Sequence, residues 1–194
     1  MRVEFPYPNY HSIAPFEVPD TNLVGVYAPR RARELGVTAT EDALIHDALA
    51  CPHGARRLCE VARPYDRVLI LFDDATRTTP IERLLTGVLD ELRAASVPDA
   101  KVTLLSAPGT HREMNDEELR HKLGAHRDRF RVEQHRWLDD TNLRDYGRTT
   151  DGVRVTADRL LGESDLVIGL GAIVPHRVKG FSGGGHVLPV VRGG

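Results

Sequence analysis

The chain has 194 residues with a formal net charge of −2, and 41% of its residues are hydrophobic and 28% charged. That length suffices for one domain with its own core, and the balanced charge gives no indication of nucleic acid or a membrane surface as a partner. No apolar run is long enough to cross a bilayer, Met1–Pro6 lacks a signal-peptide core, and two cysteines, Cys51 and Cys59, cannot form a disulfide framework, so we expect a cytoplasmic protein.

The amino-terminal third predicts an irregular arm and two helices. Residues 1–38 are rich in proline and hold one strand candidate, Asn22–Ala28. Thr40 is placed to cap a helix that reaches Ala50, and a second helical piece is expected over 55–62. The junction Cys51–Gly54 between them reads as a helix corner or, as an alternative, as a segment facing a ligand.

A buried strand and a marked helix follow. Arg67–Phe72 is a continuous apolar run, which is typical of a central strand in a parallel sheet. We expect Thr79 to be the helix N-cap, with Pro80 at the first helical position and Glu82 completing a capping box. One apolar helical stripe predicts packing on the sheet: Ile81, Leu84, Leu85, Val88, Leu89 and Leu92.

The next unit repeats the order of strand, loop and helix. Lys101–Ser106 predicts a strand and Ala107–Arg112 a loop. Asn115 and Glu118 have the spacing of a second capping box, and Gly124 is placed to end that helix.

The last third supplies more strands. We expect strands at Arg131–His135, Val153–Thr156 and Asp165–Leu170, with Gly147–Gly152 forming a turn. Alternation of strands and helices predicts an α/β fold with a mostly parallel sheet and helices on both faces, a Rossmann-like doubly wound arrangement with an irregular amino-terminal arm. No repeat or linker interrupts the chain, so 1–194 is expected to form a single domain.

Three strand ends carry polar loops: Asp73–Thr79, Ser106–Arg112 and Gly169–His186. In an open parallel sheet, ligands bind beyond the carboxyl ends of the strands, where these loops would meet. Each loop also has a simpler interpretation, because polar loop residues commonly cap helices and form turns. The coincidence of three loops at one edge favours a functional site.

The residue types suggest roles within that site. Arg77 has a planar guanidinium suited to a carboxylate or phosphate. His111 and His176 come from different strand ends and could flank a small substrate as two acid/base groups. The glycine-rich turn with Ser182 could hold a phosphate. Two bases on opposite faces of one carbon is the arrangement that a racemase needs.

Three ordered motifs resemble those of the nickel-pincer lactate racemases. They are Asp-Asp-Ala-Thr-Arg-Thr-Thr-Pro at 73–80, Ala-Pro-Gly-Thr-His-Arg at 107–112, and Pro-His-x-x-x-Gly-Phe-Ser-Gly-Gly at 175–184. The segments Cys51–Gly54 and Gln134–His135 also look like family positions. The resemblance runs from about Asn22 to the last residue and covers the amino-terminal, catalytic domain of the family.

The resemblance implies a racemase or epimerase of a small, lactate-like 2-hydroxy acid. In that family a nickel-pincer nucleotide takes a hydride from the 2-carbon while a histidine takes the hydroxyl proton, giving a 2-keto acid that receives the hydride back on either face. By motif, His111 and His176 would be the acid/base pair and Arg77 would bind the substrate carboxylate. Asp74, Thr76, Arg77, Ser182, Gly183, Gly184 and His186 would lie at the cofactor, with its phosphate near the glycines.

The chain departs from the family pattern at two places. His186 stands where the family has the lysine that tethers the cofactor, so the resemblance implies non-covalent binding, with His186 an alternative metal ligand. The nickel-ligating histidine and the second domain of the family fall beyond Gly194, so a second domain is expected to be missing here. The metal ligands, the oligomeric state and the particular 2-hydroxy acid are not indicated by the residues.

Two other functions stay open at this point. The early end and His186 are compatible with a truncated, non-catalytic domain that binds a nucleotide or another anion. A phosphate-ester hydrolase using Asp73 or Asp74 with a metal is a third hypothesis, although no further acidic metal-binding motif accompanies it.

Overall fold

The structure is a computed structural model that describes residues 2–3, 16–25, 36, 38–64, 66–177, 180–188 and 190–192. Of residues 2, 3, 186, 187 and 190–192, only the backbone is described. In this part of the chain, no helix is long and apolar enough to cross a membrane.

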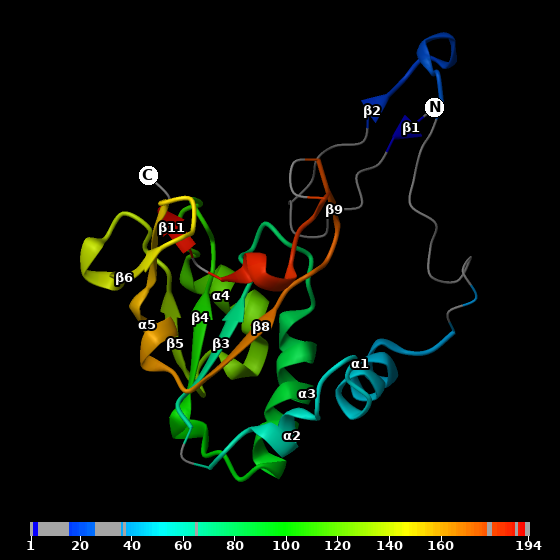
Figure 1. The fold of residues 1–194 in the computed structure, drawn as a ribbon. Helices are drawn as coiled ribbons and strands as arrows, with labels where there is room; N and C mark the ends of the chain where they lie inside the picture. Colours follow the sequence, from blue (N-terminus) through cyan, green and yellow to red (C-terminus); the bar gives the residue numbers. More distant parts are fainter. Residues whose placement is uncertain are drawn as a thin grey trace.

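A four-stranded parallel sheet forms the centre of the fold (Figure 1). Its strands are β3 (Val68–Phe72), β4 (Val102–Ser106), β5 (Arg131–Gln134) and β8 (Leu166–Leu170), in the order β5-β4-β3-β8. The run predicted as a central strand is central, since β3 pairs with β4 on one side and β8 on the other and is buried throughout. Because all four strands are parallel, their carboxyl ends lie at one edge.

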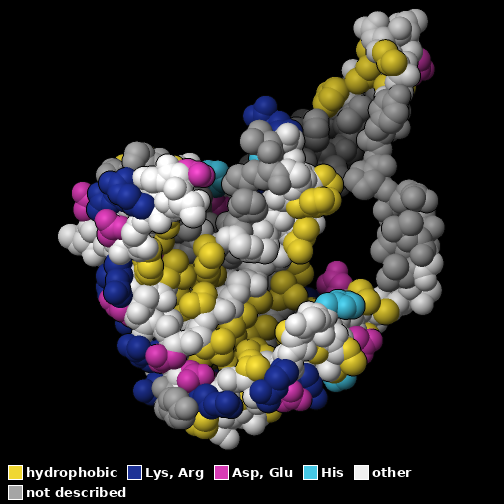
Figure 2. All heavy atoms as spheres, viewed as in Figure 1, with side chains coloured by type: hydrophobic (Ala, Val, Ile, Leu, Met, Phe, Trp, Pro, Cys, Tyr) yellow, Lys and Arg dark blue, Asp and Glu magenta, His cyan; other side chains and the backbone are white. Residues whose placement is uncertain are grey.

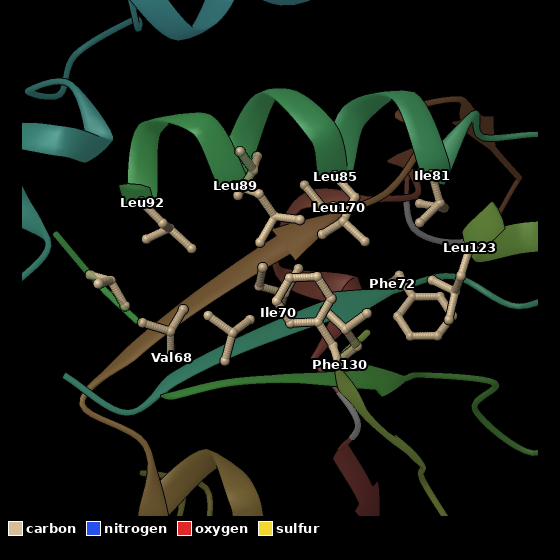
Figure 3. Close-up of a cluster of buried hydrophobic side chains, with 14 of the residues drawn as sticks. Val68, Ile70, Phe72, Ile81, Leu85, Leu89, Leu92, Leu123, Phe130 and Leu170 are labelled. Atoms are coloured by element: carbon tan, nitrogen blue, oxygen red, sulfur yellow. The ribbon is translucent and has the colours of Figure 1, made fainter. Parts of the chain in front are cut away.

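Most helices cover one face of this sheet. α3 (Ile81–Ala94) lies across it and contributes Ile81, Leu85, Leu89 and Leu92 to a core cluster with the side chains of alternate strand residues (Figure 3). α4 (Asp116–Leu123) adds to the same cluster, and α2 (Leu58–Val61) packs at its border. The helical stripe predicted for α3 is therefore the surface that packs on the sheet.

The opposite face has a thinner cover. Leu69, Leu71 and Leu105 point to this side and pack against Leu160 and Leu161 of α5 (Arg159–Glu163). Helices thus lie on both faces, which confirms the predicted α/β class. Among the described residues, β8 pairs with β3 alone, and its Val167 is 37% exposed. Figure 2 shows hydrophobic side chains gathered on the side of the molecule that β8 crosses, with charged groups around the lower and left rims.

The strand order reverses beside β3. The chain passes from β3 through α3 to β4 and through α4 to β5, moving outward in one direction, and then returns to place β8 on the other side of β3. Such a switch point opens a crevice between the loops that follow the two diverging strands. The loops after β3 and β8 are therefore where a ligand is expected.

Smaller elements complete the described chain. α1 (Glu41–Ala50) is capped by Thr40 as predicted and packs on α3. The remaining strands are β1 (Arg2–Val3) with β2 (Phe16–Glu17), β9 (Pro175–His176) with β10 (Gly180–Phe181), and a three-stranded sheet of β6 (Leu143–Arg148), β7 (Arg154–Asp158) and β11 (Val190–Arg192). The 3-10 turns are η1 (Asp20–Asn22), η3 (Asp99–Lys101), η4 (Gly124–His126), η5 (Asp140–Asn142) and η6 (Gly184–Val187).

Two local predictions are wrong. Thr79 does not cap α3, because its hydroxyl donates to Asp73 instead, and Pro80 occupies the cap position without a side-chain hydrogen bond. The strand expected at Asn22–Ala28 is not formed over 22–25, where Asn22 ends a 3-10 turn, and residues 26–28 lie outside the described chain. The capping box at Asn115 and Glu118 and the helix end at Gly124 are confirmed.

Candidate active site

The loop after β3 is shaped by the Asp74 side chain. Its Oδ1 accepts hydrogen bonds from the Thr76 amide at 3.0 Å and the Thr76 hydroxyl at 2.5 Å. The main-chain carbonyl of Asp74 accepts from the Arg77 amide at 3.1 Å. An aspartate that binds the backbone two residues on forms a local turn and fixes the path of the chain. Arg77 is exposed at the tip of this turn.

The loop after β4 brings His111 to that turn. The Ala107 amide donates to the Phe72 carbonyl at 2.9 Å, so the two loops leave the sheet side by side. Gly109, at a φ of +63°, allows the tight turn that follows. His111 Nδ1 lies 2.6 Å from Asp74 Oδ2.

This contact pairs a buried carboxylate with a half-exposed imidazole. The side chain of Asp74 is 6% exposed and that of His111 is 50% exposed. Because an ionised carboxylate only accepts hydrogen bonds, Nδ1 carries the proton that is shared with Asp74. Nε2 is then the ring nitrogen available to a ligand, and the ring cannot rotate without breaking the pair. This is how general bases are held in acid/base sites.

The loop after β8 forms a hairpin and a glycine turn. His176 in β9 lies opposite Gly180 in β10. The Ser182 amide donates to the Val174 carbonyl at 2.9 Å. Gly183 has φ +78° and ψ −164°, a region open almost solely to glycine, and a Cβ there would lie 2.5 Å from the Ala172 carbonyl oxygen.

Some of the predicted site residues are in direct contact, whereas others lie at the same edge of the sheet. Asp74, Thr76 and His111 are linked by hydrogen bonds, with Arg77 in the same turn. His176 lies in the hairpin that continues beyond the carboxyl end of β8, and Ser182–Gly184 form the glycine turn that follows it, at the edge of the sheet where the other two loops begin (Figure 1). The backbone of His186 belongs to η6, and its side chain lies outside the described residues.

Two secondary family positions have structural roles. Gln134 exchanges hydrogen bonds with the amide and carbonyl of Met114 at 2.8 and 2.9 Å. His135 is buried, with Nδ1 2.8 Å from Asp158 in β7, and so ties the parallel sheet to the antiparallel one. Cys51 and His53 are exposed at the corner between α1 and α2, and Cys51 and Cys59 are free thiols.

Lys122 is a residue that sequence reasoning missed. It is 5% exposed, and its Nζ lies 2.7 Å from Asp73 Oδ1 and donates to the Arg77 carbonyl at 2.8 Å. A signal was present, because Leu119, Lys122 and Leu123 share one apolar face of α4 and a buried lysine requires a partner. With Asp73 held by Lys122 and Thr79, and Asp74 by Thr76 and His111, neither carboxylate is disposed to bind a metal for phosphate-ester hydrolysis.

The described residues fit the phosphate of a nickel-bearing nucleotide better than they fit its metal ion. Gly183 and Gly184 of the glycine turn have positive φ, and Gly184 is exposed with open space beside its backbone, as in loops that bind anions. No group of three or more His, Cys, Asp or Glu side chains in the described ranges could hold a metal ion. These residues therefore suit a phosphate, whereas they do not form a metal site by themselves.

Comparison with known proteins gives consistent matches. The sequence model of the family described as "Lactate racemase N-terminal domain" matches residues 10–192. The chain is 31% identical over 185 residues to a lactate racemase of Thermoanaerobacterium thermosaccharolyticum and 32% identical over 152 residues to one of Lactiplantibacillus plantarum. It covers 42% and 36% of these two relatives.

Solved structures match the same way. The lactate racemase apoprotein of T. thermosaccharolyticum superposes with a TM-score of 0.76 at 27% identity, over 100% of this chain and 43% of that one. A Thermotoga maritima protein superposes with a TM-score of 0.63 at 26% identity, over 77% of this chain and 38% of that one. The chain thus spans about two fifths of the length of each of these proteins.

Proposed function

Because the chain belongs to the lactate racemase family, matching its amino-terminal domain over 10–192, we propose that it carries the acid/base groups of a racemase for a small 2-hydroxy acid. The observation that carries the proposal is the 2.6 Å contact between buried Asp74 and half-exposed His111 at the carboxyl edge of the sheet. Relatives named lactate racemase, which are isomerases, support the reaction class.

The substrate would be held by its carboxylate. Arg77 presents a guanidinium whose planar set of donors matches a carboxylate in two-point contact. It extends from the turn that Asp74 fixes, so the carboxylate and the 2-hydroxyl of one small molecule would lie beside Arg77 and His111, respectively.

His111 would move the hydroxyl proton. Nε2 accepts that proton as the hydrogen on the 2-carbon departs with its electron pair, which leaves a 2-keto acid and a protonated imidazole. Returning the hydride to the opposite face of the planar ketone, and a proton to its oxygen, gives the other enantiomer. His176 would perform the same proton transfer for that enantiomer. Asp74 would keep His111 in the required tautomer and orientation, so we assign it a positioning role.

The hydride acceptor would be the nickel-pincer nucleotide, which supplies reversible hydride uptake when bound. Thr76, Ser182, Gly183 and Gly184 would contact it, with the phosphate at the glycine turn. His186 stands where the family has its tethering lysine, and an imidazole cannot form that covalent link, so the cofactor would be held without a covalent bond. A second domain would complete the far side of the pocket, since the relatives are more than twice as long as the matched region.

A racemisation assay in D2O tests the proposal. The purified chain is supplied with the nucleotide cofactor and with L-lactate, D-lactate or other chiral 2-hydroxy acids, and the products are separated on a chiral column. We expect each active enantiomer to become a racemic mixture that keeps protium on the 2-carbon, because the hydride does not exchange with solvent. Bound cofactor without conversion, or conversion with deuterium at the 2-carbon, contradicts the proposal.

A non-catalytic nucleotide-binding domain is the second candidate. The observation in its favour is that the described residues hold no group of metal ligands beside a turn suited to phosphate. Metal analysis and native mass spectrometry of the purified protein separate the two functions. Bound nucleotide without nickel and without isomerisation would identify the binding domain.

A further inference from the structure

Helix α4 contacts both loops that carry the proposed acid/base and substrate-binding groups. It does so through two charged side chains, Glu118 and Lys122, which are four residues apart. Side chains at this spacing lie one turn apart on the same side of a helix. Neither residue belongs to the motifs from which the function is proposed.

Lys122 holds the loop after β3 at two points. Its ammonium lies 2.7 Å from Asp73 Oδ1, where the loop begins, and donates at 2.8 Å to the carbonyl of Arg77, in the middle of the loop. The Lys122 side chain is only 5% exposed, so its ammonium has lost its hydration, and these two contacts replace the lost hydrogen bonds to water. The backbone of Arg77 is thereby held at both of its polar groups, because Lys122 binds its carbonyl and Asp74 accepts from its amide.

Glu118 holds the loop after β4. Its two oxygens accept from the Arg112 guanidinium at 2.8 and 2.6 Å, and one of them also accepts from the Asn115 amide at 2.8 Å. The hydrogen bonds from Arg112, followed by that from the Asn115 amide, lower the pKa of the Glu118 carboxyl to about 2. Arg112 is the neighbour of His111, so this two-point contact anchors the segment that carries the imidazole.

Together with the Asp74–His111 contact, these interactions close a ring. One side of the ring runs from Arg77 through Lys122 to α4, and the other from α4 through Glu118 and Arg112 to His111. A helix is stiff over a single turn, whereas each loop alone has many conformations. The ring therefore fixes the backbone of Arg77, from which the guanidinium extends, relative to the segment that carries the His111 imidazole.

We propose that Lys122 and Glu118 are positioning residues that set the spacing of Arg77 and His111 through α4. The effect on catalysis rests on the proposed function, whereas the effect on the positions of the two loops rests on the contacts alone. Neither side chain touches the substrate. Displacing Arg77 would weaken binding of the substrate carboxylate in the ground state and the transition state alike.

The test compares Lys122→Met, Lys122→Arg and Glu118→Gln with the exposed control Arg120→Met on the same helix. The first readout is amide hydrogen exchange of Thr76 and Arg77, whose amides both donate to Asp74. Lys122→Met should raise both exchange rates about tenfold or more, since a loop released from its anchor opens more often. Lys122→Arg should restore most of the protection, and Arg120→Met should leave it unchanged.

The second readout is the division between KM and kcat in racemisation. A merely structural lysine would reduce the amount of folded enzyme, lowering apparent kcat at constant KM. A positioning lysine should raise KM for the 2-hydroxy acid about tenfold, since binding of the carboxylate is lost. Unchanged exchange in Lys122→Met, or raised exchange with unchanged KM, overturns the proposal.

Glu118→Gln provides an independent test if Lys122→Met fails to fold. Glutamine preserves the capping box at the start of α4 and removes the charge that pairs with Arg112. It should loosen the segment that carries His111, seen as about tenfold faster exchange of the His111 amide, which donates to the Pro108 carbonyl. Unchanged exchange there would overturn the role of Glu118. If the parent chain does not racemise, the proposed function fails, and the exchange results alone decide whether α4 holds the loops.

Discussion

The Asp74 carboxylate accepts hydrogen bonds from three donors: the Thr76 amide, the Thr76 hydroxyl and the His111 ring. One oxygen therefore shapes the loop, and the other orients the imidazole. This division explains why the buried residue two positions after the central strand is acidic, where an apolar residue would be expected on burial alone. The Asp74 side chain thus links Thr76 to the ring of His111, and the main-chain carbonyl of the same residue accepts from the Arg77 amide.

Gly183 permits the close approach of two backbone segments in the loop after β8. Replacing it with alanine should destabilise the fold, because its φ and ψ suit only glycine and the new Cβ would lie 2.5 Å from the Ala172 oxygen. We expect a loss of about 1–3 kcal/mol in the free energy of unfolding, measured by denaturant titration.

Gly180→Ala is the matched control for this prediction. Gly180 has φ +77°, but a Cβ added to it would meet nothing within 4 Å, so it isolates the backbone strain from the steric contact. A loss for Gly183→Ala no larger than that for Gly180→Ala would show that the Ala172 contact is unimportant.

At the scale of elements, α4 is the helix whose start and end agree most fully with the sequence. Asn115 and Glu118 form the expected capping box, and Gly124 ends the helix at a φ of +54°. Local signals decide these features, so one stretch of sequence suffices to predict them. The role of the same Glu118 in holding Arg112 depends on a loop that tertiary structure brings into place, and no local pattern encodes it.

The Glu118 contacts predict a pH dependence of stability. The carboxyl has a folded-state pKa of about 2 against an ordinary value of 4.5, so its contribution is complete above about 4.5 and is lost as the pH falls toward 2. Urea midpoints measured between about pH 5 and pH 2.5 should fall less steeply for Glu118→Gln than for the parent chain. Glu117→Gln, an exposed neighbour on the same helix, serves as the control, and parallel curves for all three proteins would contradict the assignment.

Other elements show where tertiary contacts override local signals. The sequence around Thr79 has the full pattern of a helix cap, yet Thr79 binds Asp73 because the two ends of the loop after β3 meet in space. β6 also escaped prediction: Leu143–Arg148 is mostly exposed and charged, and it forms a strand by pairing with β7. Strands with little burial carry weak periodicity, so only their pairing reveals them.

At the scale of the whole molecule, the four-stranded parallel sheet is the feature that the sequence predicted best. Long apolar runs such as Val68–Phe72 and the strong stripe of α3 leave few alternatives for how the layers pack. Strand order follows from tertiary structure, and it places the loops after β3 and β8 at the switch point. The polar loops at three predicted strand ends indicated where a site would lie, and the motif resemblance then suggested roles for their residues. Neither the strand ends nor the motifs predicted the role of Lys122. Its partners are a carboxylate and a carbonyl far away in the sequence, and the carbonyl lies 45 positions before it.

The central claim is that His111 and His176 are paired acid/base groups for the two enantiomers. Racemisation rates of the parent chain, His111→Asn and His176→Asn, each loaded with cofactor, test it most directly, with His46→Asn on the exposed face of α1 as control. We expect each of the two variants to lose at least about 10²-fold in rate from either enantiomer, since a general base contributes that much or more, and the control to keep full activity. Losses in the two variants no greater than in the control, with cofactor bound in all, would contradict the claim.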